Sequence, residues 1–201
     1  SWSPDGQTAA KQAQQFGYDN DFVAFMPLPY GSRSSERGLL CVNHESVRNQ
    51  VMFPGFTGPK LDNLGSELIG VEMAAVGHSI VEVSRRGDVW AADLNSTYNR
   101  RITALSEFDI SGPAAGHARM CTGDDPKGHT ALGTLGNCAG GETPWGTVLT
   151  AEENIHHFFA GDPRRTNEAA NHLVMGISVE RFHGWHVKHP RFNVEAQPSE
   201  P

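Results

Sequence analysis

The segment HSIVEVSRRGDVWAA, residues 78–92, carries the clearest secondary-structure signal in the chain. From residue 80 to residue 83, Ile80 and Glu82 alternate with Val81 and Val83. Such alternation with a period of two is typical of a strand whose two faces meet different surroundings. A turn signal, Arg85-Arg86-Gly87, comes next and leads into a second apolar run. We therefore predict an antiparallel hairpin with strands at residues 78–83 and 88–92.

Other short apolar runs also predict strands, because Pro, Gly or Ser residues bound them. These runs lie at residues 22–26, 38–43, 131–135 and 145–151. Helical periodicity is sparse: residues 8–15 and 166–175 predict short helices, and residues 67–76 fit a helix or a strand.

Glycine and proline are frequent, with 22 and 12 residues spread along the chain. This composition favours many short antiparallel strands joined by ordered loops. We predict an all-β fold with short helices in its loops, which is the pattern of a sandwich, a barrel or a propeller. Because no repeat of fixed period is legible, internal similarity does not choose among the three.

The bulk properties exclude several classes of protein. The chain has 201 residues and a formal charge of −7, without any basic cluster larger than a pair, which argues against a nucleic-acid partner. No apolar run is long enough to span a membrane, and the first residues lack a signal-peptide pattern. One domain is expected, with an acidic balance that suits cation binding. The common serine hydrolase, NTPase, dinucleotide and HExxH zinc motifs do not occur.

Cys138 lies in the glycine-rich stretch GNCAGGETPWGT, residues 136–147. The strand predicted after it ends in Glu152-Glu153-Asn154, so one thiol and two carboxylates flank a single hairpin. A mixed soft and hard metal site needs such groups. The residues leave two alternatives open for Cys138, a ligand or nucleophile and a structural thiol. Since strand side chains alternate, only one of the two adjacent carboxylates should face a given site.

Two further carboxylates and an arginine are candidates. Glu45 follows the strand at residues 38–43, where it could bind a hard cation or remain a surface residue. Glu72 is surrounded by apolar residues and needs a partner, which an arginine would provide more readily than a metal. Arg100 and Arg101 could orient a phosphate through bidentate hydrogen bonds, or could be a solvated pair.

Several longer motifs occur in order from about Gln7 to the end of the chain. They are FGYDNDF (16–22), LCVNHE (40–45), VEMAA (71–75), YNRRIT (98–103), SGPAAGH (111–117) and NCAGG (137–141) followed by EEN (152–154). Together they resemble the PhoX-type alkaline phosphatases. The resemblance implies a β-propeller built from a much longer chain, so residues 1–201 would be a single segment of the propeller domain, truncated at both ends and supplying part of the ring.

The resemblance also implies a phosphomonoesterase that depends on Fe³⁺ and Ca²⁺ and releases inorganic phosphate for scavenging. It implies Cys138 as the thiolate ligand of iron and Glu45, Glu72, Glu152 and Glu153 as ligands of iron or calcium. The nucleophile would be a metal-bridging oxygen or water, and Arg100 is the candidate for binding substrate. We expect export by the twin-arginine route to the periplasm or beyond, and a monomer at full length. The segment alone is expected to be inactive.

Two other functions remain open from the sequence. A calcium-dependent propeller esterase or lactonase would use the carboxylates without needing the thiol. A non-catalytic propeller module for binding would use metals for structure only.

Overall fold

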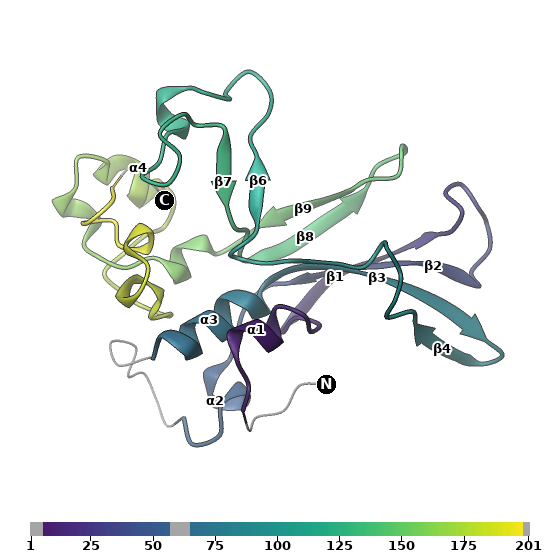
Figure 1. The fold of residues 1–201 in the computed structure, drawn as a ribbon. Helices are drawn as coiled ribbons and strands as arrows, with labels where there is room; N and C mark the ends of the chain where they lie inside the picture. Colours follow the sequence, from purple (N-terminus) through teal and green to yellow (C-terminus); the bar gives the residue numbers. More distant parts are fainter. Residues whose placement is uncertain (1–5, 57–64, 199–201) are drawn as a thin grey trace.

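The computed structural model describes residues 6–56 and 65–198. Three antiparallel sheets and several short helices make up this part of the chain, as Figure 1 shows. The predicted class, mainly β with short helices in the loops, is confirmed. The two chain ends, where we expected truncation, lie outside the described residues.

The main sheet is an antiparallel meander of four strands in sequence order. The strands are β1 (Asn20–Pro27), β2 (Arg37–His44), β3 (Gly77–Arg86) and β4 (Val89–Ala92), and the short β5 (Arg100–Ile102) also pairs with β3. Four strands in this order have the form of a propeller blade.

The hairpin predicted at residues 78–92 is confirmed as β3 and β4. Arg86 on β3 pairs with Val89 on β4, and Gly87 in the turn has φ 63, which favours glycine. The first strand continues three residues beyond the predicted end, because ladder pairing extends up to the turn itself.

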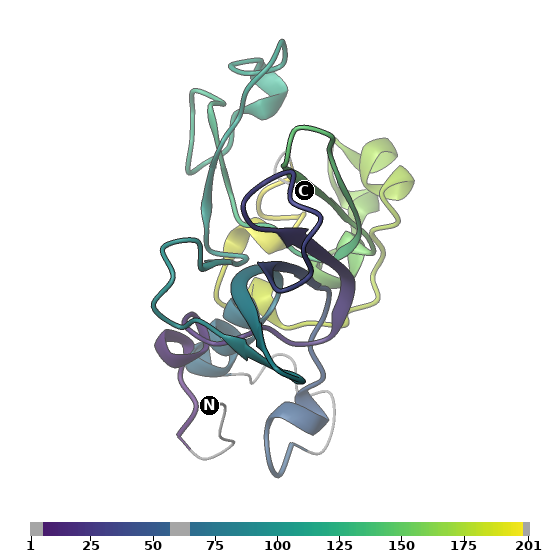
Figure 2. The same cartoon turned by 90° about the vertical axis from the view of Figure 1, so that its right-hand side faces the viewer.

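Two smaller hairpins follow. One pairs β6 (Glu107–Asp109) with β7 (Thr130–Leu132), and these strands project away from the main sheet together with the loop between them (Figures 1 and 2). The other pairs β8 (Asn137–Glu142) with β9 (Val148–Glu152). Both predicted strands in this region are shorter than expected, ending at Leu132 and beginning at Val148.

The α-helices are short. They are α1 (Ala9–Gln12), α2 (Asn49–Met52), α3 (Ser66–Ala75) and α4 (Ala169–Val174), and α3 resolves the ambiguous segment as a helix. Single turns of 3₁₀ helix lie at Ala118–Met120, Ile155–Phe158, Pro163–Arg165, Trp185–Val187 and Pro190–Phe192. No helix among the described residues is both long and apolar enough to cross a membrane.

The larger hydrophobic core joins α3 to the C-terminal part of the chain. Ile69 and Met73 of α3 are fully buried in the same cluster as Phe158, Trp185 and Phe192. A smaller cluster lies on the main sheet around Cys41. The segment after β9 adds no strand to the described sheets. Apolar packing against α3 therefore holds it in place.

Candidate metal centre

Two β-bulges shape the centre. In β1 the pairing with β2 passes from Asn20↔His44 to Val23↔Val42, so Asp21 and Phe22 together face Asn43. In β8 the pairing with β9 shifts in the same way, and Cys138 and Ala139 together face one residue. A bulge redirects the side chains of its extra residues. Asp21 and Cys138 both lie at such positions.

Asp21, Glu45 and Cys138 come together at this place. One ligand atom of each lies within 4.8 Å of the others. The Cys138 thiol donates a hydrogen bond to Asp21 Oδ2 at 2.9 Å. Glu45 is oriented through its main chain, since its N–H donates to the carbonyl of Asp19 at 2.9 Å.

Glu153 lies one residue beyond β9, and its side chain forms a hydrogen bond with the Cys138 thiol. Its backbone N–H donates to the carbonyl of Gly136 at 2.7 Å, and a Cβ at Gly136 would collide with the Glu153 carbonyl oxygen. Asn154 adopts a left-handed backbone, with φ 54, and its amide donates to Glu153 Oε1 at 2.9 Å. The chain reversal at Asn154 thus fixes Glu153 beside the thiol.

The centre has a concentration of negative charge. Hydrogen bonds to Asp21 and then to Glu153 raise the pKa of Cys138 to about 12. Burial raises the pKa of Glu45, and the neighbouring carboxylates of Asp21, Asp19 and Glu153 add to this effect. A bound cation would lower the pKa of both Cys138 and Glu45 again, because it favours the deprotonated form of every group around it. The donor set, one thiol and several carboxylates, therefore fits a cation.

Glu152 does not belong to this group of side chains. Its Oε1 atom accepts hydrogen bonds from Thr134 Oγ1 at 2.8 Å and from the Leu135 N–H at 2.9 Å. It lies opposite Asn137 in the ladder and contacts the start of β8. Of the two adjacent carboxylates, Glu153 is the one whose side chain interacts with the Cys138 thiol, and the ligand role of either stays a prediction.

Glu72 lies elsewhere, in α3 within the larger core. It is fully buried, and its Oε2 accepts a hydrogen bond from Trp185 Nε1 at 2.6 Å, with His183 Nδ1 at 3.9 Å. Burial raises the pKa of Glu72 to about 7. One oxygen, Oε2, is thus partnered by an indole N–H, where the sequence had favoured an arginine, whereas the buried Oε1 has no hydrogen-bond partner among the described residues.

Arg100 and Arg101 differ in their surroundings. Arg100 is exposed on β5 opposite Ile80, and it borders a cavity of about 390 Å³ that Cys41 and His78 also line. Arg101 is not a solvated surface residue, because its guanidinium donates hydrogen bonds to five backbone carbonyl groups. Two of them, Ala74 and Val76, lie at the C-terminal end of α3. Burial lowers the pKa of Arg101 to about 10.

Asp21 was not singled out from the sequence as a site residue. The motif Asp19-Asn20-Asp21 appears there only as part of the resemblance, because nothing local predicts a bulge. The bulge depends on the pairing of β1 with β2, and β2 begins only at Arg37, well beyond the residues next to Asp21 in the sequence. Turn-forming residues directly before an apolar strand are the one signal that could have pointed to it.

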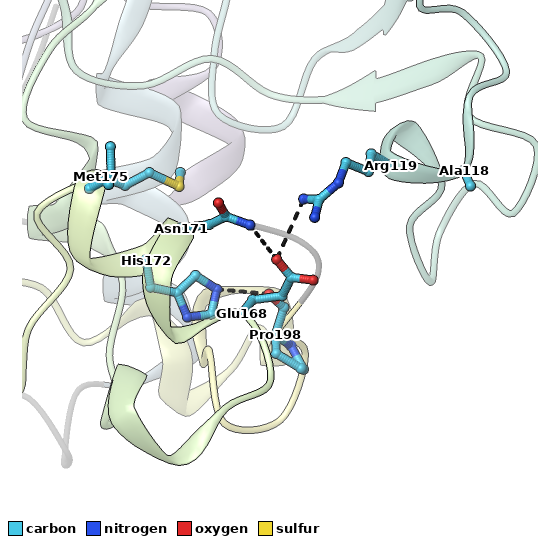
Figure 3. Close-up of a pocket in the computed structure, with 8 residues that line it drawn as sticks. Ala118, Arg119, Glu168, Asn171, His172, Met175 and Pro198 are labelled. Carbon is cyan, nitrogen blue, oxygen red and sulfur yellow. Dashed lines mark hydrogen bonds and ion pairs between the residues drawn. The ribbon is translucent and has the colours of Figure 1, made fainter.

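A cavity of about 520 Å³ lies apart from these residues, between the loop at Ala118 and α4 (Figure 3). Arg119 Nη1 lies 3.4 Å from Glu168 Oε2, and His172 Nε2 lies 2.7 Å from the carbonyl oxygen of Pro198. None of the predicted metal ligands lines this cavity. Its polar groups are engaged with one another, as the dashed lines in Figure 3 mark.

Comparison with known sequences identifies the family. The sequence model described as "Alkaline phosphatase PhoX" matches residues 1–201. The chain belongs to the PhoX family. The resemblance drawn from the motifs is thus confirmed. A comparison with curated proteins gave no match.

A solved structure shares the fold. It is Pseudomonas fluorescens PhoX in complex with vanadate, described as a transition state analogue. The two sequences are 36% identical, and the TM-score is 0.88 over 100% of this chain and 34% of that one. The chain described here therefore spans about a third of the length of that PhoX. That residues 1–201 form one segment of a larger propeller domain stays a prediction.

Proposed function

We propose that the complete protein hydrolyses phosphate monoesters at a metal centre to which this chain contributes Asp21, Glu45, Cys138 and Glu153. The observation that carries the proposal is the convergence of the Cys138 thiol and the carboxylates of Asp21 and Glu45 within 4.8 Å in a chain of the PhoX family. The vanadate complex of Pseudomonas fluorescens PhoX supports phosphoryl chemistry for the family.

The donor set favours two kinds of ion. Carboxylate oxygens suit Ca²⁺, and a thiolate together with carboxylates suits Fe³⁺. When bound, such ions would neutralise charge on a phosphoryl group and make a bridging oxygen or water nucleophilic at neutral pH. No protein nucleophile is then needed.

The residues of this chain would have distinct tasks. Asp21, Glu45 and Glu153 would hold the cations, and Cys138 would give up the proton that it now donates to Asp21. We assign Glu152 and Glu72 to structure, because the hydrogen bonds of each lead away from the cluster. Arg100 would act on substrate only if the remainder of the protein brings phosphate to β5.

The wider role follows from the family. We propose an exported, monomeric enzyme of the periplasm or cell exterior that recovers phosphate from varied esters. Residues 1–201 would be one segment of its propeller domain and inactive alone, because the rest of the site would come from the part of the protein outside this chain.

Metal analysis of the complete protein, combined with turnover of p-nitrophenyl phosphate, tests the proposal. We expect bound iron and calcium, and a loss of turnover of at least about 100-fold in Cys138→Ala. Absence of iron, or full activity in this variant, would overturn the role of the thiolate. Hydrolysis of lactones without hydrolysis of phosphate esters would instead indicate the esterase class.

A further inference from the structure

Asn43 is fully buried between the two bulges that carry Asp21 and Cys138. It lies on β2 directly opposite the β1 bulge, and its side chain reaches the β8 bulge. Asn43 Nδ2 donates to the carbonyl oxygen of Cys138 at 2.8 Å and to that of Ala139 at 3.1 Å. These are the two carbonyls of the bulged residues, where ladder pairing with β9 is interrupted.

The other end of the amide is also occupied. Asn43 Oδ1 accepts from His78 Nδ1 at 2.7 Å and from Thr150 Oγ1 at 3.0 Å. An asparagine side chain has two donor hydrogens and two acceptor lone pairs, and all four are used here. The orientation of the amide is therefore fixed from both sides, by β3 and by β9.

We propose that Asn43 is a positioning residue for Cys138, one that holds the β8 bulge so that the thiol faces Asp21 and Glu153. This inference rests on the proposed metal centre. Without the two donors of Asn43, the carbonyls of Cys138 and Ala139 would be left without these partners, and the bulge could relax to another register. The thiol would then move relative to carboxylates held by β1 and by the end of β9.

The Asn43→Asp variant tests the idea, because it keeps the shape and the acceptor and removes the donors. The complete protein is stripped of metal with a chelator and titrated with Co²⁺ alone, and the thiolate-to-cobalt charge-transfer band is recorded. We expect Co²⁺ binding roughly 10- to 100-fold weaker than in wild type, as for other residues that orient a ligand, with a weaker band per bound ion.

Asn99→Asp is the matched control. Asn99 also joins backbone groups beside the main sheet, accepting from the Glu82 N–H and donating to the Asp93 carbonyl, but it does not contact the β8 bulge. The same chemical change there should leave the band and the affinity as in wild type. A second variant, Asn43→Ser, avoids a buried charge and should show the same loss as Asn43→Asp.

The outcomes separate the two proposals. No charge-transfer band in wild type, or an unchanged band in Cys138→Ser, would refute the thiolate ligand itself. A normal band and wild-type affinity in either folded Asn43 variant would refute only its positioning role. If Asn43→Asp fails to melt cooperatively in the metal-free state, Asn43→Ser decides.

Discussion

Glu152 and Glu153 are neighbours in sequence, yet they have different partners. Glu152 accepts hydrogen bonds from Thr134 and Leu135, whereas Glu153 contributes to the raised pKa of Cys138. The difference arises because Glu152 ends β9 and follows its alternation, and Glu153 is held by Gly136 and by the reversal at Asn154. A single residue step therefore separates a structural carboxylate from a candidate ligand.

Paired substitutions test this assignment. Glu153→Gln should weaken binding of Co²⁺ to the metal-stripped complete protein by at least about tenfold, because a charged donor is lost. Glu152→Gln keeps an acceptor oxygen for Leu135, so we expect affinity within about twofold of wild type and a stability loss below about 1 kcal/mol. Equal effects of the two changes on affinity would show that the assignment is wrong.

The protonation of Cys138 predicts how cation binding responds to pH. Its pKa, raised to about 12 by Asp21 and Glu153, lies above the ordinary thiol value, so the cation-free site carries the proton at neutral pH. Binding as a thiolate must release that proton, and affinity should rise about tenfold per pH unit on this account. Calorimetry in buffers of different ionisation enthalpy should find about one proton fewer released by Cys138→Ser. Equal proton release in the two proteins would count against thiolate ligation.

At the scale of elements, α3 shows where sequence patterns reach their limit. Its residues from Ile69 to Ala75 are buried except for Gly70, so apolar side chains occur all round the helix and no amphipathic period remains to read. Its one charged buried residue, Glu72, binds Trp185, which lies 113 positions away. Neither the helix nor the partner of its carboxylate could be predicted locally.

Glu72→Gln should stabilise the protein at alkaline pH. Burial raises the pKa of Glu72 from 4.5 to about 7, so the contribution of this one group to stability falls as pH rises from about 4.5 through 7 and stays reduced above it. The neutral amide of the variant avoids the cost of ionising a buried carboxyl group, which reaches roughly 3 kcal/mol above pH 7. We expect the melting-temperature difference between variant and wild type to grow from pH 5 to pH 8.5.

This change also distinguishes structure from metal binding. A variant with normal iron and calcium content would support the structural assignment of Glu72. Loss of metal in Glu72→Gln, or a melting difference that does not change with pH, would speak for the ligand role that the family resemblance implied.

The elements that the sequence predicted well share one property, which is that neighbouring residues determine them. The hairpin at residues 78–92 needs only alternation and a glycine turn, and both are local. The bulges in β1 and β8 require knowledge of the opposing strand, so Cys138 and Glu45 could be proposed but their meeting with Asp21 could not. In the segment after β9 the local pattern predicted the short helix α4, whereas the packing of the rest against α3 depends on distant contacts.

On the scale of the whole molecule, neutral histidines lie inside the fold. Burial lowers the pKa of His44 to about 3, and it lowers those of His78 and His183 to about 4. His44 accepts hydrogen bonds at Nε2 from the Gly17 N–H and from Ser79 Oγ, if its proton lies on Nδ1 toward Asn20. Protonation would remove that acceptor and place a charge near the buried Arg101.

Acid should therefore destabilise the protein as pH falls below 6.5, because the three histidines together outweigh the opposite contribution of Glu72. Each of these histidines has a folded pKa below its ordinary value of 6.5, so its contribution is complete above pH 6.5 and is lost as pH falls below it. The loss is roughly 1.4 kcal/mol per pH unit for each group. Urea unfolding of the complete, metal-free protein between pH 7.5 and 5 measures the slope. Stability that stays constant or rises over this interval would contradict the burial of neutral histidines.

The span between Asp21 and Cys138, 117 residues, has a consequence for the timing of assembly. During synthesis the first strand of the main sheet emerges long before the thiol, and the β8–β9 hairpin must dock on the main sheet before all four side chains meet. A cation arriving early would find isolated carboxylates and no site. Cation binding would then require that residues 21 to 153 have completed their fold, so the metal content of a sample would report the fraction of molecules that have folded this far.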